Sequence, residues 1–209
     1  QQRNKNMMNL KQALDAIRPL DEQAILLCKE RWDSIGSPLY SLGKLETETA
    51  RIAGMFGTGD VRLDKKALVI MCADHGVLEE GVSQSPVEVT AIVAENFMTM
   101  EASASIMARR AGVDVFPVDI GVAQDTKIIN RKIAYGTNNM AKGCAMTREQ
   151  AVKGIEVGIQ MVEELKQKGY RIICTGEMGV GNTTATSAMA AVMLNESAET
   201  VTGRGSGLT

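Results

Sequence analysis

The spacing of hydrophobic residues divides the chain into two regions. In the first region apolar positions recur at helical spacing, and the pattern predicts short helices over residues 10–18 and 22–34 and a third helix that ends near Gly54. A glycine-containing linker follows at residues 57–60. We therefore expect a small helical domain over residues 1–57 and a second domain over residues 58–209.

In the second region short apolar runs alternate with longer segments at helical spacing. Three of the runs predict buried strands, at residues 67–73, 113–122 and 170–174. The longer segments predict helices at residues 87–111, 147–168 and 182–195, and a further strand is expected to begin at Val201-Thr202. Because strands and helices alternate, the pattern predicts an α/β fold with a parallel sheet and right-handed crossovers.

Individual residues add detail to these elements. Thr147 and Gln150 form a capping-box pattern at the start of one helix, and Asn182 is expected to cap another. Pro117 lies inside the second strand, which indicates an edge position or a bulge. Cys72 and Cys174 lie in the predicted strands, so we expect both thiols to be buried.

Composition and charge exclude several classes of protein. The 23 Lys and Arg residues nearly balance 25 Asp and Glu residues, and aromatic residues make up 3%, so no basic or base-stacking surface for nucleic acid is expected. No apolar run approaches the roughly 18 residues of a membrane helix. The N-terminus is polar and has no apolar signal segment, so we expect a cytoplasmic protein. Four scattered cysteines and one histidine argue against a metal site.

The sharpest chemical pattern is the glycine-rich segment at residues 176–184, between a predicted strand and a predicted helix. Gly176, Gly179 and Gly181 let backbone N–H groups approach an anion at the positive end of the helix. The spacing is that of a P-loop, but Asn182 stands in place of the lysine, which disfavours nucleoside triphosphate hydrolysis. The segment therefore predicts a site for a single phosphate monoester, with Thr183 and Thr184 as hydroxyl donors, and a tight turn without a ligand is the alternative.

Other polar residues near the predicted strand ends have open roles. Glu177 is expected to accept hydrogen bonds from ribose hydroxyls or to neutralise a developing cation, and a solvated loop residue is the alternative. His75 is expected to act as a general base or, with Asp74, to fix its loop by hydrogen bonds. Asp119 is a loop anchor or a ligand group. The segment Gly203-Arg204-Gly205-Ser206-Gly207 fits a second phosphate-binding loop.

Three longer segments carry a specific resemblance. DHGVLEEGVSQSPVEVT at residues 74–90, GEMGVGNTT at 176–184 and GRGSGL at 203–208 resemble the signature blocks of the nicotinate-nucleotide–dimethylbenzimidazole phosphoribosyltransferase family. Residues 41–46, 96–97 and 118–122 fit the same family in the same order. The resemblance implies an enzyme that moves phosphoribose from nicotinate mononucleotide to an aromatic base. The products are nicotinate and an α-ribotide for cobamide (vitamin B12) biosynthesis.

The resemblance also implies an architecture and a set of site residues. The family has a Rossmann-like parallel sheet with helices on both faces and a small helical domain, forms homodimers, and uses no metal or other cofactor. Glu177 is implied as a supporting catalytic residue. By the resemblance, Glu177 and Gly179 contact the phosphoribose, and Gly203 and Gly205 lie nearby. With the other candidates of the two glycine-rich segments, the predicted phosphoribose-binding residues are Gly176, Gly179, Gly181, Asn182, Thr183, Gly203, Arg204 and Gly205.

This chain departs from the family pattern at three places. The family's general base, a glutamate, lies in a C-terminal block that we expect beyond Thr209, as does a phosphoribose-contacting lysine, so we expect the chain to be incomplete. Ile92 stands where family members commonly have a glutamine that hydrogen-bonds the aromatic base. Met100-Glu101 replaces a common glycine pair, and Tyr40 replaces a usual glycine.

The departure at Ile92 leads to a hypothesis about the acceptor. The acceptor pocket is expected to comprise Ser83, Gln84, Ser85, Pro86, Ile92 and Met178. Because a phenol has no second ring nitrogen, an apolar Ile92 would suit a phenol better than a benzimidazole. Family members that activate phenols can work as paired unlike subunits, so a heterodimer with a homologous subunit is the alternative to a homodimer. A non-catalytic partner subunit and a generic nucleotide-binding module are the competing functions.

Overall fold

The computed structural model describes residues 8–205 and divides the chain into two compact units. Of the described residues, one unit comprises Lys11–Asp64, and the other comprises residues 65–205 together with residues 8–10. No helix among the described residues is both long and apolar enough to cross a bilayer.

The smaller unit is built from helices. After α1 (Leu10–Asp15), the helices α2 (Glu22–Asp33) and α3 (Lys44–Phe56) pack on each other through a small core of Cys28, Ala50 and Ala53. The Asp21 carboxylate accepts a hydrogen bond from the Ala24 N–H at 2.9 Å and so caps α2. The predicted helices are therefore confirmed.

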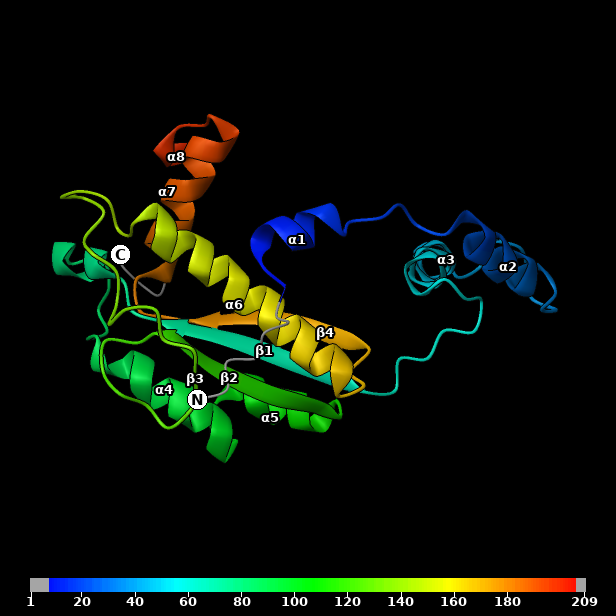
Figure 1. Ribbon diagram of the computed structural model, residues 1–209, viewed down its shortest axis with the longest axis horizontal. Coiled ribbons are helices and arrows are strands. Elements are labelled where there is room, and N and C mark those ends of the chain that lie inside the picture. Colours follow the sequence, from blue (N-terminus) through cyan, green and yellow to red (C-terminus); the bar gives the residue numbers. More distant parts are fainter. Residues whose placement is uncertain (1–7, 206–209) are drawn as a thin grey trace. The chain divides into compact units, whose positions relative to one another are not determined.

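The larger unit contains a four-stranded sheet of order β3-β2-β1-β4 in which all neighbouring strands are parallel (Figure 1). The strands are β1 (Lys66–Ala73), β2 (Val113–Gly121), β3 (Ile129–Asn130) and β4 (Ile172–Met178). The predicted parallel sheet is confirmed, while the two-residue strand β3 was not predicted because it is too short to leave a pattern.

Helices cover both faces of this sheet (Figure 1). On one face α4 (Glu88–Thr99) contributes Ala91, Ala94 and Phe97 to a core with Ile70 and Cys72, and α5 (Ser103–Arg110) contacts β2 nearby. On the other face lies α6 (Arg148–Gln167). The chain after β4 forms α7 (Asn182–Leu194) and α8 (Ala198–Val201), and a short 3₁₀ helix, η1, spans Gly76–Glu80.

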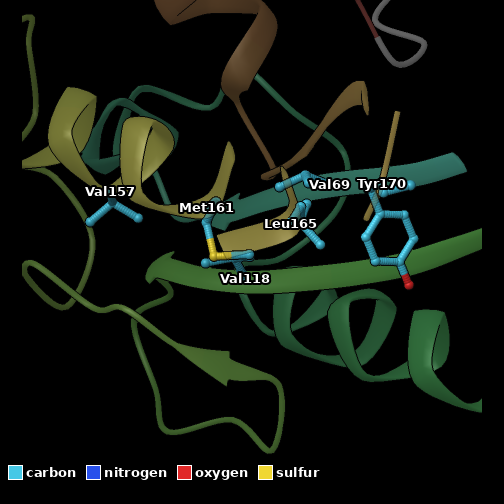
Figure 2. Packing of buried hydrophobic residues seen from close by; sticks show 7 residues of the cluster. Val69, Val118, Val157, Met161, Leu165 and Tyr170 are labelled. Atoms are coloured by element: carbon cyan, nitrogen blue, oxygen red, sulfur yellow. The ribbon is translucent and has the colours of Figure 1, made fainter. Parts of the chain in front are cut away.

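The core under α6 shows how the sequence pattern produces the packing (Figure 2). Val157, Met161 and Leu165 recur every four residues and so lie on one face of α6, where they pack against Val69 and Val118 of the sheet. The capping box predicted at the start of α6 is confirmed, because the side chains of Thr147 and Gln150 each accept from the other's backbone N–H.

Three predicted elements were wrong in part. The single helix predicted over residues 87–111 is divided into α4 and α5, because Met100 takes a left-handed backbone conformation with φ of 61°. The strand predicted at Val201-Thr202 is wrong, since the region forms the short helix α8. Asn182 is the first residue of α7, and Gly181 with φ of 88° occupies the N-cap position.

The last strand also differs from its prediction. The predicted strand 170–174 starts later and runs on to Met178, so Gly176 and Glu177 belong to β4. Among the described residues β4 has a strand neighbour on one side only, which leaves Cys174 exposed instead of buried. Cys72 in β1 is buried as predicted, and burial raises the pKa of its thiol to about 12.

Pro117 lies on an open stretch of β2. It stands opposite Ile70 of β1, whereas β3 pairs only with Val118 and Asp119, one step further along β2. Pro117 therefore lies where β2 is a sheet edge, which is one of the two positions predicted for it. The register shift between β1 and β2 lies elsewhere, between Cys72 and Ala73 of β1.

The core under α6 allows a direct test. Leu165 is 1% exposed, whereas Val162 on the same helix is 45% exposed. Replacing Leu165→Ala should lower the free energy of unfolding by about 2–5 kcal/mol, because it leaves a cavity between α6 and the sheet. Val162→Ala should lower it by less than about 1 kcal/mol. Denaturant unfolding of both variants measures the difference, and equal losses would contradict the packing.

Candidate functional site

The carboxyl ends of β1, β2 and β4 lie at one edge of the sheet, since the strands are parallel. The loop after β4 approaches the end of β1 so closely that a Cβ at Gly179 would lie 2.1 Å from the carbonyl oxygen of Ala73 and 3.1 Å from Nε2 of His75. Only glycine fits at this position, because real Cβ atoms do not approach a backbone atom within 3.0 Å. The loop predicted from its glycines is thus held tightly against β1.

Two hydrogen bonds fix the turn between β4 and α7. The N–H of Val180 donates to the buried hydroxyl of Thr90 on α4 at 3.0 Å, and the N–H of Asn182 donates to the carbonyl of Gly179 at 3.1 Å. Gly181 then adopts a left-handed conformation at the start of α7. The turn is therefore preorganised by the fold around it.

A cavity of about 660 Å³ lies at the start of α7, where the two glycine-rich segments meet. Of the residues predicted to bind phosphoribose, Asn182, Thr183, Gly203, Arg204 and Gly205 line it, and Glu177, Thr184, Ser187, Thr202 and Val82 are among its other lining residues. A Cβ at Gly205 would lie 2.9 Å from the hydroxyl of Thr183, so the segments touch. Ser206 and Gly207 lie outside the described residues.

The remaining glycines of this predicted set have different positions. Gly179 and Gly181 form the turn just described, and Gly176 lies within β4, where a Cβ would meet the side chains of Ile70 and Leu68 at 3.3 and 3.5 Å. Gly176 thus packs against the sheet core and does not line the cavity.

Glu177 lines this cavity and is hydrogen-bonded to the first residue of α7. The Nδ2 group of Asn182 donates a hydrogen bond to its Oε2 oxygen, and the carboxylate is exposed. A carboxylate held there can accept hydrogen bonds from hydroxyl groups of a ligand and can lie beside a positive charge.

His75 follows Asp74 in the chain, and its ring lies against the glycine turn at Gly179. Burial lowers the pKa of its imidazole, and the negative charges of Asp74 and Glu177 oppose that effect. His75 is the single histidine of the chain, and the direction of the shift favours its neutral form near pH 7.

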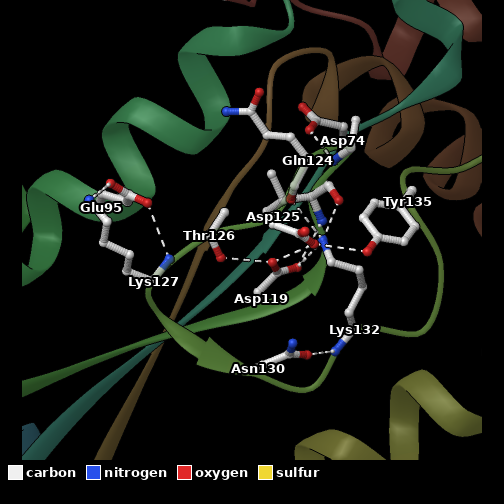
Figure 3. A network of polar contacts seen from close by, with 12 residues as sticks. Asp74, Glu95, Asp119, Gln124, Asp125, Thr126, Lys127, Asn130, Lys132 and Tyr135 are labelled. Atoms are coloured by element: carbon white, nitrogen blue, oxygen red, sulfur yellow. Dashed lines mark hydrogen bonds and ion pairs between the residues drawn. The ribbon is translucent and has the colours of Figure 1, made fainter.

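Asp119 acts as a loop anchor, one of the two roles that its sequence position left open. Its buried carboxylate accepts from the N–H of Val122 at 3.0 Å and from the hydroxyl of Thr126 at 2.8 Å, and it forms an ion pair with Lys132 at 2.9 Å (Figure 3). The Lys132 ammonium lies 4.5 Å from the ring centroid of Tyr135. Lys132 was missed by the sequence reasoning, because nothing in a lone lysine predicts a buried partner.

A second cavity, of about 440 Å³, lies beside Asp74 and His75 and is also bordered by Pro86. Asp74 is buried, and its Oδ2 oxygen accepts a hydrogen bond from the N–H of Ala123 at 2.7 Å. Gly76 allows the residue 137–139 loop to pack there, since a Cβ on it would lie 2.5 Å from the carbonyl oxygen of Thr137.

The six residues predicted for an acceptor pocket do not line one cavity together. Pro86 lines the cavity beside Asp74, whereas Met178 packs against the core that contains Ile70 and Cys72. Ile92 is 56% exposed on α4 and lines neither of the two cavities just described. In the preceding loop the Ser83 hydroxyl accepts from the N–H of Ser85 at 3.1 Å, and Gln84 is exposed.

A third cavity, of about 600 Å³, was not predicted at all. It lies between the ends of β1 and β2 and the start of α6, and its lining is largely apolar, including Ile120, Ile133, Met146 and Ile155. Its lining residues come from several distant segments, so no local pattern could have shown it. Among the described residues, no three His, Cys, Asp or Glu side chains gather in an arrangement that could hold a metal ion.

Comparison with known proteins identifies the family of this chain. The sequence model of the DBI_PRT family, described as phosphoribosyltransferase, matches residues 17–209. The chain belongs to this phosphoribosyltransferase family. The resemblance carried by the three signature segments is thus confirmed.

Individual relatives within the family are similar over nearly all of the chain. The nicotinate-nucleotide–dimethylbenzimidazole phosphoribosyltransferase of Clostridium tetani is 43% identical over 206 residues, which cover 97% of this chain and 57% of that protein. The enzyme of the same name from Acetivibrio thermocellus is 46% identical over 200 residues, covering 94% and 57%. The chain therefore spans less than two thirds of the length of these curated relatives.

Solved structures support the same assignment. The crystal structure of CobT from Thermus thermophilus superposes on this chain with a TM-score of 0.84 and is 35% identical in sequence. The match covers 90% of this chain and 57% of the CobT chain. The nicotinate-nucleotide–dimethylbenzimidazole phosphoribosyltransferase structure from the same organism superposes with a TM-score of 0.82 at 34% identity, covering 89% and 58%.

The contact at Gly179 predicts a strong effect of one methyl group. Gly179→Ala should lower the free energy of unfolding by roughly 1–3 kcal/mol, because the added Cβ collides with the Ala73 carbonyl. Gly158→Ala on α6 is the matched control. A Cβ there meets nothing within 4 Å, and alanine should stabilise the helix by about 0.5–1 kcal/mol. Denaturant unfolding that shows the same effect for both variants would refute the contact.

The pKa of His75 can be read directly, because no other histidine contributes a signal. The NMR titration midpoint of its ring should lie below 6.5, and Glu177→Gln should lower it further, since that variant removes a negative charge that raises the pKa. The unfolded chain then binds more protons than the folded chain just below pH 6.5, so the contribution of His75 to stability is lost as the pH falls. A midpoint above 6.5 would contradict the burial of the ring.

Proposed function

We propose that the full-length protein transfers phosphoribose from nicotinate mononucleotide to an aromatic base, with release of nicotinate and formation of an α-ribotide for cobamide biosynthesis. The observation that carries the proposal is the cavity at the start of α7, where the two glycine-rich segments meet. The membership of the chain in the phosphoribosyltransferase family supports it. The chain spans only part of its relatives, so the proposal concerns the protein that contains this chain.

The phosphate of the donor fits the start of α7. Backbone N–H groups and the positive end of the helix dipole favour an anion there, and the hydroxyls of Thr183 and Thr184 and the guanidinium of Arg204 supply further donors. Arg204 is the only cationic side chain among the described lining residues, so a monoester phosphate matches the cavity better than a triphosphate.

Glu177 and Asn182 support the chemistry at the ribose. The pyridinium ring of the donor is a good leaving group, and its departure leaves positive charge on the ribose. The Glu177 carboxylate, which is held by Asn182 and lines the cavity, stabilises that charge and accepts a hydrogen bond from a ribose hydroxyl. Deprotonation of the acceptor is assigned to a glutamate expected beyond Thr209, and the principal work of the described residues is to hold the reactants together.

We place the acceptor next to the loop of Ser83, Gln84, Ser85 and Pro86. The contribution of Met178 and Ile92 stays a prediction from the sequence, since neither lines the cavity that Pro86 borders. Support comes from Pro86, which borders a cavity together with His75, while His75 in turn lies against the glycine turn. Both a benzimidazole and a phenol remain candidate acceptors. We also propose that the protein is cytoplasmic and forms a dimer of like or unlike subunits.

The decisive experiment is an incubation of the full-length protein with nicotinate mononucleotide and either dimethylbenzimidazole or p-cresol, followed by chromatography of nicotinate and the ribotide. Release of nicotinate with formation of a ribotide supports the proposal. Absence of turnover until a homologous subunit is added would favour the non-catalytic partner instead. Binding of ATP in place of nicotinate mononucleotide would favour a generic nucleotide-binding module.

The same assay tests Ile92. Ile92→Gln should raise the rate with dimethylbenzimidazole relative to p-cresol several-fold, because the amide gains a hydrogen bond that isoleucine cannot make. Met98→Gln, on the same helix and 51% exposed, is the matched control and should leave the ratio unchanged. Equal ratios in the wild type and both variants would remove Ile92 from the acceptor site.

A further inference from the structure

The turn between β4 and α7 has little stiffness of its own. Gly179 and Gly181 flank Val180, and Gly181 takes a left-handed backbone conformation with φ of 88°. Because glycine has access to more backbone conformations than any other residue, a Gly-Val-Gly segment does not hold one shape by itself. The shape of the turn therefore depends on its contacts with other elements.

Contacts of two kinds reach the turn from outside. Close packing acts on the glycines, since a Cβ at Gly179 would lie 2.1 Å from a carbonyl oxygen of β1 and a Cβ at Gly181 would lie 3.7 Å from the Cβ of His75. Packing limits how near the backbone comes to its neighbours, whereas a hydrogen bond also fixes the direction of a peptide group. The N–H of Val180 supplies that bond by donating to the Thr90 hydroxyl at 3.0 Å.

Thr90 is a fixed anchor for this hydrogen bond. It is the third residue of α4 and is 0% exposed, and Val180 is 8% exposed, so both partners are shielded from water. The helix itself is packed on the sheet core through Ala91, Ala94 and Phe97. In such a buried place an N–H that loses its acceptor stays unsatisfied, which is costly. The turn is therefore held to α4 by a bond that solvent cannot replace.

The residues on either side of the turn belong to the proposed phosphoribose site. Glu177 comes two residues before Gly179, Asn182 comes directly after Gly181, and the side chains of Glu177 and Asn182 are hydrogen-bonded to each other. Both residues line the cavity of about 660 Å³, together with Thr183. A change in the turn would therefore displace the carboxylate and the start of α7, and a misplacement of about 1 Å can cost about a hundredfold in rate.

From these contacts we infer that Thr90 is a positioning residue for the phosphoribose donor. Its hydroxyl accepts from the Val180 N–H and so holds the glycine turn in the geometry that binds the donor. Thr90 does not line the cavity and takes no part in bond making. The inference rests on the proposed function and deepens it, because it adds a residue outside the cavity to those on which donor binding depends.

Hydrogen exchange of the full-length wild-type protein, followed by NMR, is the first test. The Val180 amide should exchange at least about a hundredfold more slowly than in an unstructured peptide, because it is buried and hydrogen-bonded. Nicotinate mononucleotide should slow this exchange further. An unprotected Val180 amide would overturn the inference, and this measurement needs no variant.

Thr90→Val tests the hydroxyl itself, since it replaces the hydroxyl with a methyl group of nearly the same size. The dissociation constant and the KM for nicotinate mononucleotide should both rise about tenfold, as expected when one buried hydrogen bond is lost. Thr90→Ser keeps a hydroxyl acceptor and should stay within about threefold of the wild type. Calorimetric titration and initial rates measure these constants. Equal affinities in the wild type and Thr90→Val, or the same loss in Thr90→Ser, would overturn the inference.

Ser105→Ala separates positioning of the turn from a general loss of stability. Ser105 is also 0% exposed, its hydroxyl donates to the carbonyl of Ala102 at 2.7 Å, and it does not line the cavity. Removing this buried hydroxyl should lower the denaturation midpoint, as Thr90→Val does, but the dissociation constant of the donor should change by less than about twofold. The same loss of donor affinity in both variants would assign the effect to stability and overturn the inference.

The outcomes separate this inference from the proposed function. If the wild type releases nicotinate from nicotinate mononucleotide but Thr90→Val keeps the wild-type affinity, the role of Thr90 fails and the proposed function stands. If the wild type binds nicotinate mononucleotide but releases no nicotinate with any acceptor, and Thr90→Val weakens that binding, the proposed function fails and Thr90 remains a positioning residue of a nucleotide site. If the wild type does not bind nicotinate mononucleotide, both fail.

Discussion

The close contact between the Gly179 backbone and the Ala73 carbonyl oxygen sets the geometry on which the site depends. It brings the loop after β4 within reach of the end of β1, and so places His75 and Glu177 near one another. The hydrogen bond from Val180 to Thr90 links the same turn to α4. The ends of β1 and β4 and helix α4 thus meet at a point where no side chain would fit.

A second constraint acts on the loop that follows β2. The buried ion pair of Asp119 and Lys132 fixes the backbone after β2, and Lys132 also donates to the carbonyls of Val122 and Gln124. A buried ion pair is weak evidence for stability, because desolvation of both charges offsets much of their attraction. Its role here is positional: it shapes the loop whose Ala123 N–H holds the Asp74 carboxylate.

The sequence predicted the features that depend on periodicity and local chemistry. The strand of residues 67–73, the capping box at Thr147 and the glycine turn follow from neighbouring residues and were predicted with small errors of boundary. The left-handed Met100 was missed, because a helical apolar pattern continues through it. The partners of Asp74, Asp119 and Lys132 were missed as well, since these contacts join segments distant in sequence that only the tertiary fold brings together.

The open edge of β4 has a consequence for ligand binding. Among the described residues this strand is paired on one side only, and α7, which follows the glycine turn, has no buried residue and leaves Val192 and Met193 more than four fifths exposed. The turn is therefore held between two elements that are only partly packed. A polypeptide that paired with β4 or covered α7 would therefore bury apolar surface on the two elements that join at the glycine turn.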